Sequence, residues 1–183
     1  MITLVPRHWD KQEFLANLAN LKVQVGAEIG VWKGDFSCQI LKMMPELKLY
    51  LVDSWKPLSK EEYEDVLSGT SEETFEYMYQ MVKALVRPYP GVQILRMRSL
   101  EALPLIPDDS LDFVFIDANH KYEFVKADIE GWFKKVKKGG IISGHDFDFG
   151  HWGVVRAVTE LSYLGIQEVI YCKPDDIWVT LKP

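Results

Sequence analysis

Side chains that can do chemistry stand directly after five apolar runs of this sequence. Carboxylates and imidazoles can accept protons, bind cations or accept hydrogen bonds from hydroxyl groups. Each such residue alone also has a structural explanation, such as an acid that caps a turn. Their repetition after successive strands favours one shared binding site. The residues are Glu28, Gly30 and Gly34 after the first run, Asp53 after the second, Ser99 after the third, Asp117 and His120 after the fourth, and His145 and Asp146 after the fifth.

The first apolar run, residues 21–29, leads into a turn with two glycines and then into a helix. Gly30 and Gly34 allow a sharp turn and a close approach to a ligand, where a β-carbon would collide. The helix that follows directs its amino-terminal N–H groups into this turn, which favours a polar or anionic ligand. Glycines after a strand also serve packing alone, so the stretch is informative only together with the residues downstream.

Asp53 adds a second feature of nucleotide sites. It follows Gly30 at about the 20-residue offset where an acid can accept hydrogen bonds from both hydroxyls of a ribose. The dinucleotide fingerprint G-x-G-x-x-G is absent, because Gly30 is followed by Trp32 and then Gly34. The turn is therefore poorly suited to bind a pyrophosphate, and this disfavours nicotinamide and flavin cofactors.

The apolar runs alternate with helical patterns, which predicts an α/β fold with a mostly parallel sheet and a ligand cleft at the carboxyl ends of its strands. Only residues 173–176 separate the last two runs, and so short a gap can join only antiparallel neighbours. The sequence therefore predicts a seven-stranded sheet with an antiparallel C-terminal hairpin. The predicted strands are residues 21–29, 47–52, 92–97, 111–116, 141–143, 169–171 and 177–180, and the predicted helices include residues 9–20, 35–44, 122–136 and 154–164.

Residues 59–87 are predicted to form two helices with a break near Gly69. This helical insertion, about residues 56–88, is a candidate lid over the cleft. Its aromatic residues are equally well explained as core or as a subunit interface, which leaves a homodimer open. The expected capping boxes are Ser59 with Glu62 and Thr70 with Glu73, and the aromatic residues are Tyr63, Phe75, Tyr77 and Tyr79.

A single domain over residues 1–183 is expected, because a chain of this size can bury enough surface to fold without disulfide bonds or metal. The formal net charge of -6 argues against nucleic acid or an anionic membrane as a partner. No apolar run reaches the length of a membrane-spanning helix, and the first ten residues lack the apolar stretch of a signal peptide. Cys38 and Cys172 lack ligand-like spacing and are expected to be reduced thiols of a cytoplasmic protein.

Four stretches together resemble the motifs of class I S-adenosylmethionine-dependent methyltransferases. The likeness is greatest to small stand-alone bacterial enzymes related to catechol-type O-methyltransferases, and it runs from about Val25 to Thr180. Trp32 replaces the middle glycine of the general pattern E-x-G-x-G-x-G, at a position where this branch tolerates a bulky residue. The resemblance implies a Rossmann-like three-layer sandwich. The four stretches are residues 28–37, 51–55, 110–122 and 139–146.

The resemblance also implies how S-adenosylmethionine would be bound. The glycine turn, with Trp32 in it, would pass under the methionine part of the cofactor. The acid after the second strand would hold the ribose. Residue by residue, Gly30 and Gly34 would lie under the methionine part, Glu28 near its amino group, Asp53 at the ribose, Ser54 and Trp55 beside the adenine, Ser99 at the adenine edge, and Asp117 at the methionyl ammonium or a divalent cation.

A divalent metal is a second implication of the resemblance. Catechol-type relatives bind magnesium through an acid after the fourth strand and an acid–amide pair after the fifth. The matching residues here are Asp117, His145 and Asp146. Imidazole suits zinc, iron, manganese or nickel better than magnesium, so His145 departs from the oxygen-only pattern. The alternative is that His145 and Asp146 form a hydrogen-bonded pair that lines the acceptor pocket.

His120 matches the basic lysine of these relatives and is expected to be the catalytic base. The ordinary pKa of histidine, near 6.5, lets it take a hydroxyl proton at neutral pH. His145 is the second candidate for a catalytic role. The alternative for His120 is a structural one, capping the helix that begins at Tyr122. His151 and Trp152 are expected to shape the pocket.

The leading interpretation is an S-adenosylmethionine-dependent methyltransferase that acts on a small molecule, at oxygen. A nicotinamide-dependent oxidoreductase on a similar sheet is one alternative, and the absent fingerprint and the reversed hairpin speak against it. A non-catalytic cofactor-binding module of the same fold is the other alternative. Acceptor-dependent turnover distinguishes the module from an enzyme.

Overall fold

The computed structural model describes residues 2–8, 10–57, 59 and 69–183 of the chain. One sheet is built from eight strands in the order β1-β7-β8-β6-β5-β2-β3-β4. The strands are β1 (Thr3–Arg7), β2 (Val25–Ile29), β3 (Lys48–Asp53), β4 (Val92–Arg96), β5 (Leu111–Ile116), β6 (Val136–Gly144), β7 (Glu168–Cys172) and β8 (Ile177–Leu181). The α-helices are α1 (Lys11–Asn20), α2 (Asp35–Met43), α3 (Glu72–Val86), α4 (Ser99–Ala102), α5 (Tyr122–Lys135) and α6 (Trp152–Thr159), and two 3-10 helices cover Leu103–Leu105 and Leu161–Leu164.

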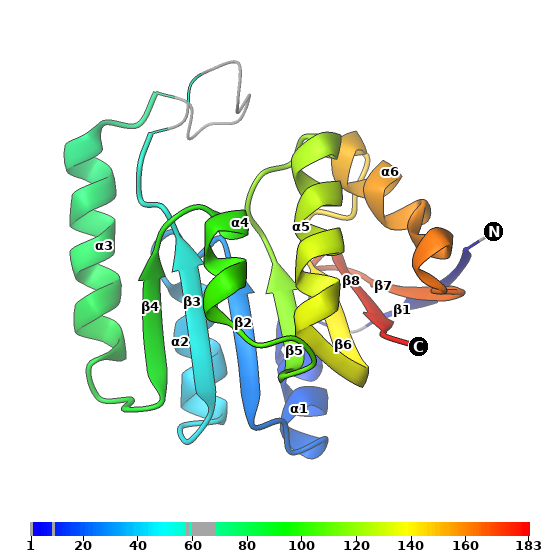
Figure 1. Cartoon of the computed structure of the whole chain (residues 1–183), viewed down its shortest axis with the longest axis horizontal. Helices are drawn as coiled ribbons and strands as arrows, with labels where there is room; N and C mark the ends of the chain where they lie inside the picture. The colour runs from blue at the N-terminus through cyan, green and yellow to red at the C-terminus, as the bar shows by residue number, and fades with distance from the viewer. Residues whose placement is uncertain (1, 9, 58, 60–68) are drawn as a thin grey trace.

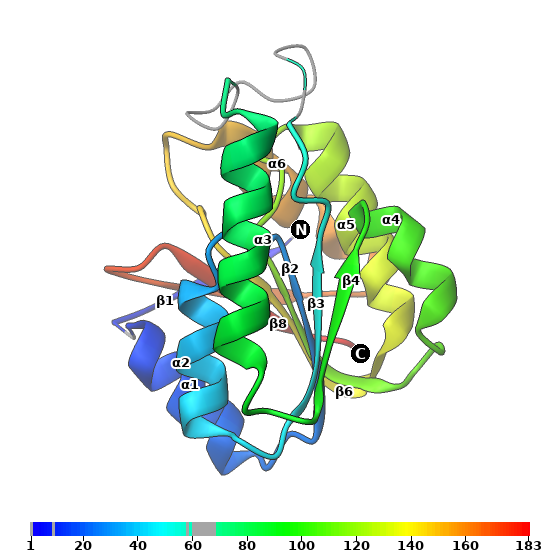
Figure 2. The same ribbon diagram turned by 90° about the vertical axis from the view of Figure 1, so that its left-hand side faces the viewer.

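The sheet lies between two layers of helices (Figures 1 and 2). Helices α1, α2 and α3 cover one face, where Leu18 and Ile40 pack on the same core as Leu51 of the sheet. Helices α4, α5 and α6 cover the other face, where Ile129 packs with Val114. Each fully buried aliphatic side chain of this kind contributes roughly 1.5–3 kcal/mol to folding. The predicted three-layer α/β sandwich is confirmed.

The strand order explains where a ligand cleft must lie. Strands β4, β3, β2, β5 and β6 are mutually parallel, while β8 runs antiparallel to both β6 and β7. The predicted C-terminal hairpin is therefore confirmed. The chain moves outward from β2 through β3 to β4 and then returns to β5 on the other side of β2. A crevice forms at such a reversal, outside the carboxyl ends of the strands.

The sheet has one strand more than the seven that were predicted. Strand β1 pairs in parallel with β7 at the edge of the sheet, with Thr3 opposite Glu168. Residues 3–7 neither alternate nor form an apolar run, and Pro6 is unfavourable within a strand except at an edge. Its pairing partner lies far along the chain, so the local pattern does not reveal it.

Several predicted boundaries differ from the structure. Strand β6 begins at Val136, ahead of the glycine pair, because Val136 already pairs with Leu111 before an irregularity in register. Helix α6 ends at Thr159, and the continuation predicted to residue 164 is a separate 3-10 helix. Helix α1 begins at Lys11, where Asp10 accepts a hydrogen bond from the N–H of Glu13.

Helix α3 begins one residue away from the predicted cap. Ser71, rather than Thr70, is the N-cap, and its hydroxyl accepts a hydrogen bond from the N–H of Thr74 at 3.2 Å. The predicted Thr70–Glu73 capping box is therefore wrong, because the chain offers two hydroxyl residues in succession. The first helix predicted in residues 59–87, including Tyr63 and the Ser59–Glu62 box, lies essentially outside the described residues.

Two aromatic residues of α3 pack inward and one faces outward. Phe75 is buried, and the ring of Tyr79 lies 5.1 Å from that of Trp55. Tyr77 is 66% exposed. The role of the insertion as a lid and the homodimer stay predictions. Within the described parts of the chain, no helix has the length and apolar character needed to cross a membrane.

Candidate active site

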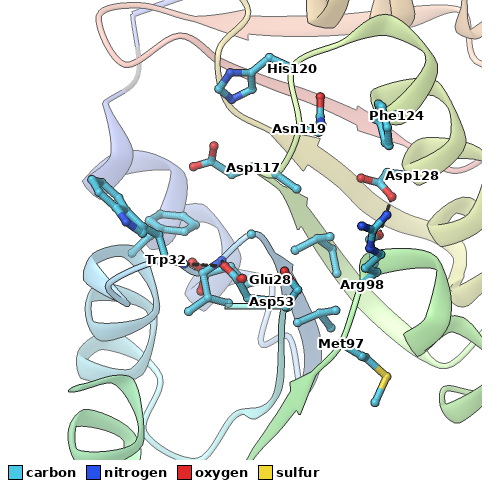
Figure 3. A pocket seen from close by; sticks show the side chains of 18 of the residues that line it. Glu28, Trp32, Asp53, Met97, Arg98, Asp117, Asn119, His120, Phe124 and Asp128 are labelled. Carbon is cyan, nitrogen blue, oxygen red and sulfur yellow. Dashed lines mark hydrogen bonds between the residues drawn. The ribbon is translucent and has the colours of Figure 1, made fainter. Parts of the chain in front are cut away.

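A cavity of about 600 Å³ opens beside the carboxyl ends of β2, β3, β4 and β5 (Figure 3). This volume lies within the range of roughly 300–1,000 Å³ that is common for small-molecule sites. The predicted site residues that line it are Glu28, Gly30, Trp32, Asp53, Ser54, Ser99, Asp117 and His120. Gly34 and Trp55 are not among its lining residues, and His145 and Asp146 lie next to His120 in a small adjoining space.

The two glycines of the turn are explained by contacts within the chain. Gly30 has a left-handed backbone with φ +86°, and a Cβ there would lie 1.9 Å from the carbonyl oxygen of Asp117. Gly34 has φ +79°, and a Cβ there would lie 3.1 Å from Val82 on α3. Glycine is thus required at position 30 because the loops that follow β2 and β5 pass very close to each other at the cavity.

Asp53 organises the turn after β2. Its Oδ2 accepts hydrogen bonds from the N–H groups of Val31 and Trp32, both at 2.9 Å, and its Oδ1 accepts one from the N–H of Trp55 at 2.8 Å. The buried indole of Trp55 donates in turn to the carbonyl of Trp32 at 2.8 Å. An ionised carboxylate has about four acceptor positions, so one position on Oδ1 is left for a ligand hydroxyl.

Glu28 is an almost fully buried acid in the wall of the cavity. The Ser37 hydroxyl donates a hydrogen bond to its carboxylate at 2.5 Å. Burial raises the pKa of Glu28 to about 8, although the bond from Ser37 acts in the opposite direction. A group of this kind is costly to ionise unless a cation binds beside it. Glu28 therefore suits the positively charged part of a ligand.

Asp117 is the second acid in this part of the cavity. It follows β5, and its N–H continues the sheet by donating to the carbonyl of Ile29 at 2.7 Å. Burial raises the pKa of Asp117, while the positive charge of His145 opposes this shift. Figure 3 shows the Asp117 carboxylate in the cavity, between His120 and Trp32. Two acids with raised pKa values thus share one end of the site.

Asp146 joins three histidines beside this end of the cavity. Its Oδ2 lies 2.9 Å from Nε2 of His120, and its Oδ1 lies 3.0 Å from Nδ1 of His145 and 3.8 Å from Nδ1 of His151. Burial disfavours its charged form, but the hydrogen bonds from His120 and His145 hold the pKa of Asp146 far below its usual range. Asp146 is therefore an anion at neutral pH.

The histidines differ in what else surrounds them. Burial works to lower the pKa of His145, but the hydrogen bond to Asp146 and the charge of Asp117 raise it above its ordinary value. The ring of His151 lies 4.6 Å from that of His120, and its Nδ1 is 3.1 Å from Asp148. Of the three, His120 lines the large cavity. The geometry therefore places His120 closest to a ligand.

The groups that can hold a metal differ from the predicted set. Asp117, His120 and Asp146 each offer one ligand atom, and these atoms lie within 4.8 Å of one another. His120 thus takes the place that was predicted for His145, whose imidazole is bonded to Asp146 from the other side. A second group of the same kind among the described residues is Asp146, Asp148 and His151.

The opposite end of the cavity combines apolar side chains with a buried acid. Ser99 donates to Asp128 at 2.5 Å and accepts a hydrogen bond from Nε1 of Trp132 at 2.9 Å. Burial raises the pKa of Asp128 to about 6. Met97, Arg98 and Phe124 lie at this end in Figure 3. The hydroxyl predicted at the adenine edge is thus engaged by two protein groups.

Sequence reasoning missed several lining residues, and some of them left a signal. Asp128 is an acid on the apolar stripe of α5, between Val125 and Trp132, which is unusual unless the acid has a hydrogen-bond or charge partner. Lys11 left no signal, because it stands at the start of an ordinary amphipathic helix. The lining residues that were not predicted include Lys11, Gln39, Lys56, Met97, Arg98, Asn119, Phe124 and Asp128.

Comparison with known proteins identifies a matching protein family. Residues 27–147 match a family model described as a methyltransferase domain. A curated relative, the uncharacterized protein y4gI of Sinorhizobium fredii, is 35% identical over 83 residues. These residues are 42% of this chain and 9% of that protein, so the chain spans only a small part of the length of this relative.

Solved structures share the fold. The O-methyltransferase TomG from Streptomyces achromogenes, solved in complex with SAM, superposes with a TM-score of 0.65 at 16% identity, over 94% of this chain and 79% of that chain. The O-methyltransferase NovP superposes with a TM-score of 0.67 at 20% identity, over 94% of this chain and 77% of that chain. At such identities the likeness shows the fold alone.

Proposed function

This chain belongs to the methyltransferase domain family, and from that premise we propose that it transfers a methyl group from S-adenosylmethionine to an oxygen atom of a small-molecule acceptor. One observation carries the proposal. Two acids with raised pKa values, Glu28 and Asp117, share one end of a cavity of about 600 Å³, and a histidine bonded to an aspartate lines the same end. Such an arrangement suits a cationic cofactor and a proton-bearing acceptor.

The residues present fit this cofactor. Glu28 and Asp117 would hold its methionyl ammonium, because a bound cation offsets the cost of ionising buried acids. Asp53 has one acceptor position left, so we expect it to hold one ribose hydroxyl rather than two. Met97 and Phe124 offer an apolar surface to the flat adenine base. The bound cofactor supplies an electrophilic methyl group on a positively charged sulfur.

His120 is the residue that we assign as the base. Asp146 is ionised and can only accept hydrogen bonds, so Nε2 of His120 carries the proton between them. We assign the other ring nitrogen, Nδ1, to take the proton of an acceptor hydroxyl. The charged imidazole that results is stabilised by Asp146. His145, bonded to the other carboxylate oxygen, holds Asp146 in place.

A metal would compete with this arrangement for the same imidazole. In a complex held by Asp117, His120 and Asp146, Nε2 of His120 would be a ligand and not a hydrogen-bond donor. Two carboxylates and one imidazole suit manganese, iron or zinc better than magnesium. We favour the base role, and removal of metal from the protein distinguishes the two uses of His120.

Calorimetric titration tests the proposal directly. The protein is titrated with S-adenosylhomocysteine and, separately, with NADH. We expect S-adenosylhomocysteine to bind and NADH not to bind. Binding of NADH alone would favour the oxidoreductase. The protein is next incubated with methyl-labelled S-adenosylmethionine and a panel of hydroxylated small molecules. Binding of S-adenosylhomocysteine without any labelled product would favour the non-catalytic module.

A further inference from the structure

Lys11 belongs to the cavity although it lies outside the part of the chain that matches the methyltransferase domain. It is the first residue of α1, sixteen positions ahead of residue 27, where that match begins. Its half-buried side chain lines the cavity together with Glu28, Asp117 and Gln39. A segment that precedes the matched domain therefore completes the wall of the site.

Contacts with the C-terminal hairpin hold Lys11 in this position. The N–H of Lys11 donates to the carboxylate of Asp175, in the turn between β7 and β8, at 2.6 Å. The N–H of Lys173 donates to the carbonyl of Arg7 at 3.0 Å. Strand β1 also pairs with β7 along its length. The two ends of the chain thus fix the first turn of α1 at the edge of the cavity.

The ammonium group of Lys11 has no ion-pair or hydrogen-bond partner among the described residues. Its positive charge helps to lower the pKa values of Glu28, Asp117 and His145, although burial is the larger influence on each of them. These three residues stand at the ends of β2, β5 and β6. The charge of Lys11 therefore acts on the end of the cavity where the two acids meet.

The other cations that line the cavity are placed differently. Lys33 lies 3.9 Å from the carboxylate of Asp35, and its ammonium sits 4.2 Å from the centre of the Trp32 ring. Lys56 is exposed. Arg98 lies at the opposite end, beside Asp128 (Figure 3). Of these cations, Lys11 is thus the one whose charge acts on both Glu28 and Asp117.

We propose that Lys11 binds the α-carboxylate of the methionine part of the cofactor. This inference rests on the proposed function. The α-ammonium and the α-carboxylate of an amino acid are attached to the same carbon atom. If Glu28 and Asp117 hold the ammonium, they also repel the carboxylate next to it. A cation that lines the same cavity offsets that repulsion, and Lys11 supplies it from α1.

A pair of ligands tests this role by binding alone. S-Adenosylhomocysteine carries the amino-acid group, whereas 5′-methylthioadenosine has the same adenosyl thioether without it. A charge-assisted contact of this kind corresponds to about 10- to 100-fold in affinity. We expect Lys11→Met to weaken S-adenosylhomocysteine by that factor and to leave 5′-methylthioadenosine within about twofold. Lys11→Arg should restore most of the affinity.

Lys42→Met is the matched control, because Lys42 is exposed on α2 and is not among the lining residues of the cavity. Its affinity for S-adenosylhomocysteine should stay within about twofold of the unchanged protein. Equal weakening of both ligands by Lys11→Met would assign Lys11 a purely structural role and overturn the inference. Unchanged affinity for S-adenosylhomocysteine would also overturn it. If the unchanged protein itself failed to bind S-adenosylhomocysteine, the proposed function would fall as well, so the two failures are distinguishable.

Discussion

His120 and Asp146 follow different strands of the sheet, β5 and β6, yet Nε2 of the histidine lies 2.9 Å from Oδ2 of the aspartate. The other carboxylate oxygen of Asp146 contacts His145, and the backbone of Asp146 has a left-handed φ of +60°. Asp is one of the few residues that adopt this conformation readily. The loop after β6 is thus shaped so that one anion meets two imidazoles at the edge of the cavity.

Replacing His120 tests the role of this pair. If His120 takes the acceptor proton, His120→Ala should lower kcat by about 10²- to 10⁴-fold. Affinity for S-adenosylhomocysteine should hardly change, because other residues bind the cofactor. Steady-state kinetics and calorimetry measure the two quantities. His8→Ala, at an exposed position away from the cavity, is the control. Unchanged turnover in His120→Ala together with a loss in His145→Ala would move the role to His145.

Metal removal tests the competing use of the same imidazole. We expect methyl transfer to survive exhaustive chelation, because in the proposed mechanism His120 acts as a base with its Nε2 paired to Asp146 rather than to a metal. The measurement is the initial rate before and after chelation, with metal content determined in parallel. Loss of activity that manganese or zinc restores would contradict the metal-independent base and support a site formed by Asp117, His120 and Asp146.

Glu28 should make the stability of the ligand-free protein depend on pH. Its pKa is about 8 in the folded protein against an ordinary value of 4.5. The unfolded chain releases this proton first, so the contribution of Glu28 to stability is complete below pH 4.5 and is lost as the pH rises through 8. Glu28→Gln, which keeps a partner for Ser37, should therefore gain stability over the unchanged protein across this range, on the order of 3 kcal/mol at pH 7.

Chemical denaturation at several pH values measures this difference. Glu46→Gln, at an exposed position, is the control, and it should show no comparable trend. A stability difference for Glu28→Gln that does not change between pH 5 and pH 8, a span that falls within the range from 4.5 to about 8 set by the two pKa values, would contradict the raised pKa of Glu28.

Cofactor binding should release a proton from the same residue. At pH 7 the carboxyl group of Glu28 is mostly protonated, since its pKa is about 8. An ammonium bound beside it favours the ionised form, so binding of S-adenosylhomocysteine should release up to about one proton near this pH. Titrations in buffers of different ionisation enthalpy measure the number. The release should be much smaller in Glu28→Gln, and equal release in both proteins would assign it to another group.

Alanine substitutions at Gly30 and Gly139 form a matched pair that tests the close approach of the two loops that follow β2 and β5. Both have left-handed backbones, with φ of +86° and +74°, but only a Cβ at Gly30 would collide, at 1.9 Å from the Asp117 carbonyl oxygen, whereas nothing lies within 4 Å of one at Gly139. Gly139→Ala should therefore cost only the backbone strain of about 1–2 kcal/mol. Gly30→Ala should cost roughly 2 kcal/mol more. Denaturant unfolding measures both, and equal losses would contradict the collision.

Much of the fold can be predicted from the sequence, because burial imposes a regular spacing of apolar residues on each helix and strand. The strands ending before Asp53 and Asp117 are apolar runs, and a parallel sheet places their ends at one edge. Strand β1 was missed because its pairing with β7 is a long-range contact and Pro6 disguises its pattern. The Ser71 cap was missed by one residue because the chain offers two adjacent hydroxyls.

The sequence by itself determined the α/β class, the antiparallel hairpin and the set of acids and histidines that meet at the carboxyl ends of the strands. These follow from local periodicity and from the rule that parallel strands end together. Only the tertiary structure decided how those residues pair. In the structure, Asp53 accepts hydrogen bonds from three backbone N–H groups, and Asp146 contacts both His120 and His145. Lys11 lines the cavity although its helix lies outside the matched domain. Such pairings depend on distances of a few ångströms between segments far apart in the chain, and no local pattern encodes them.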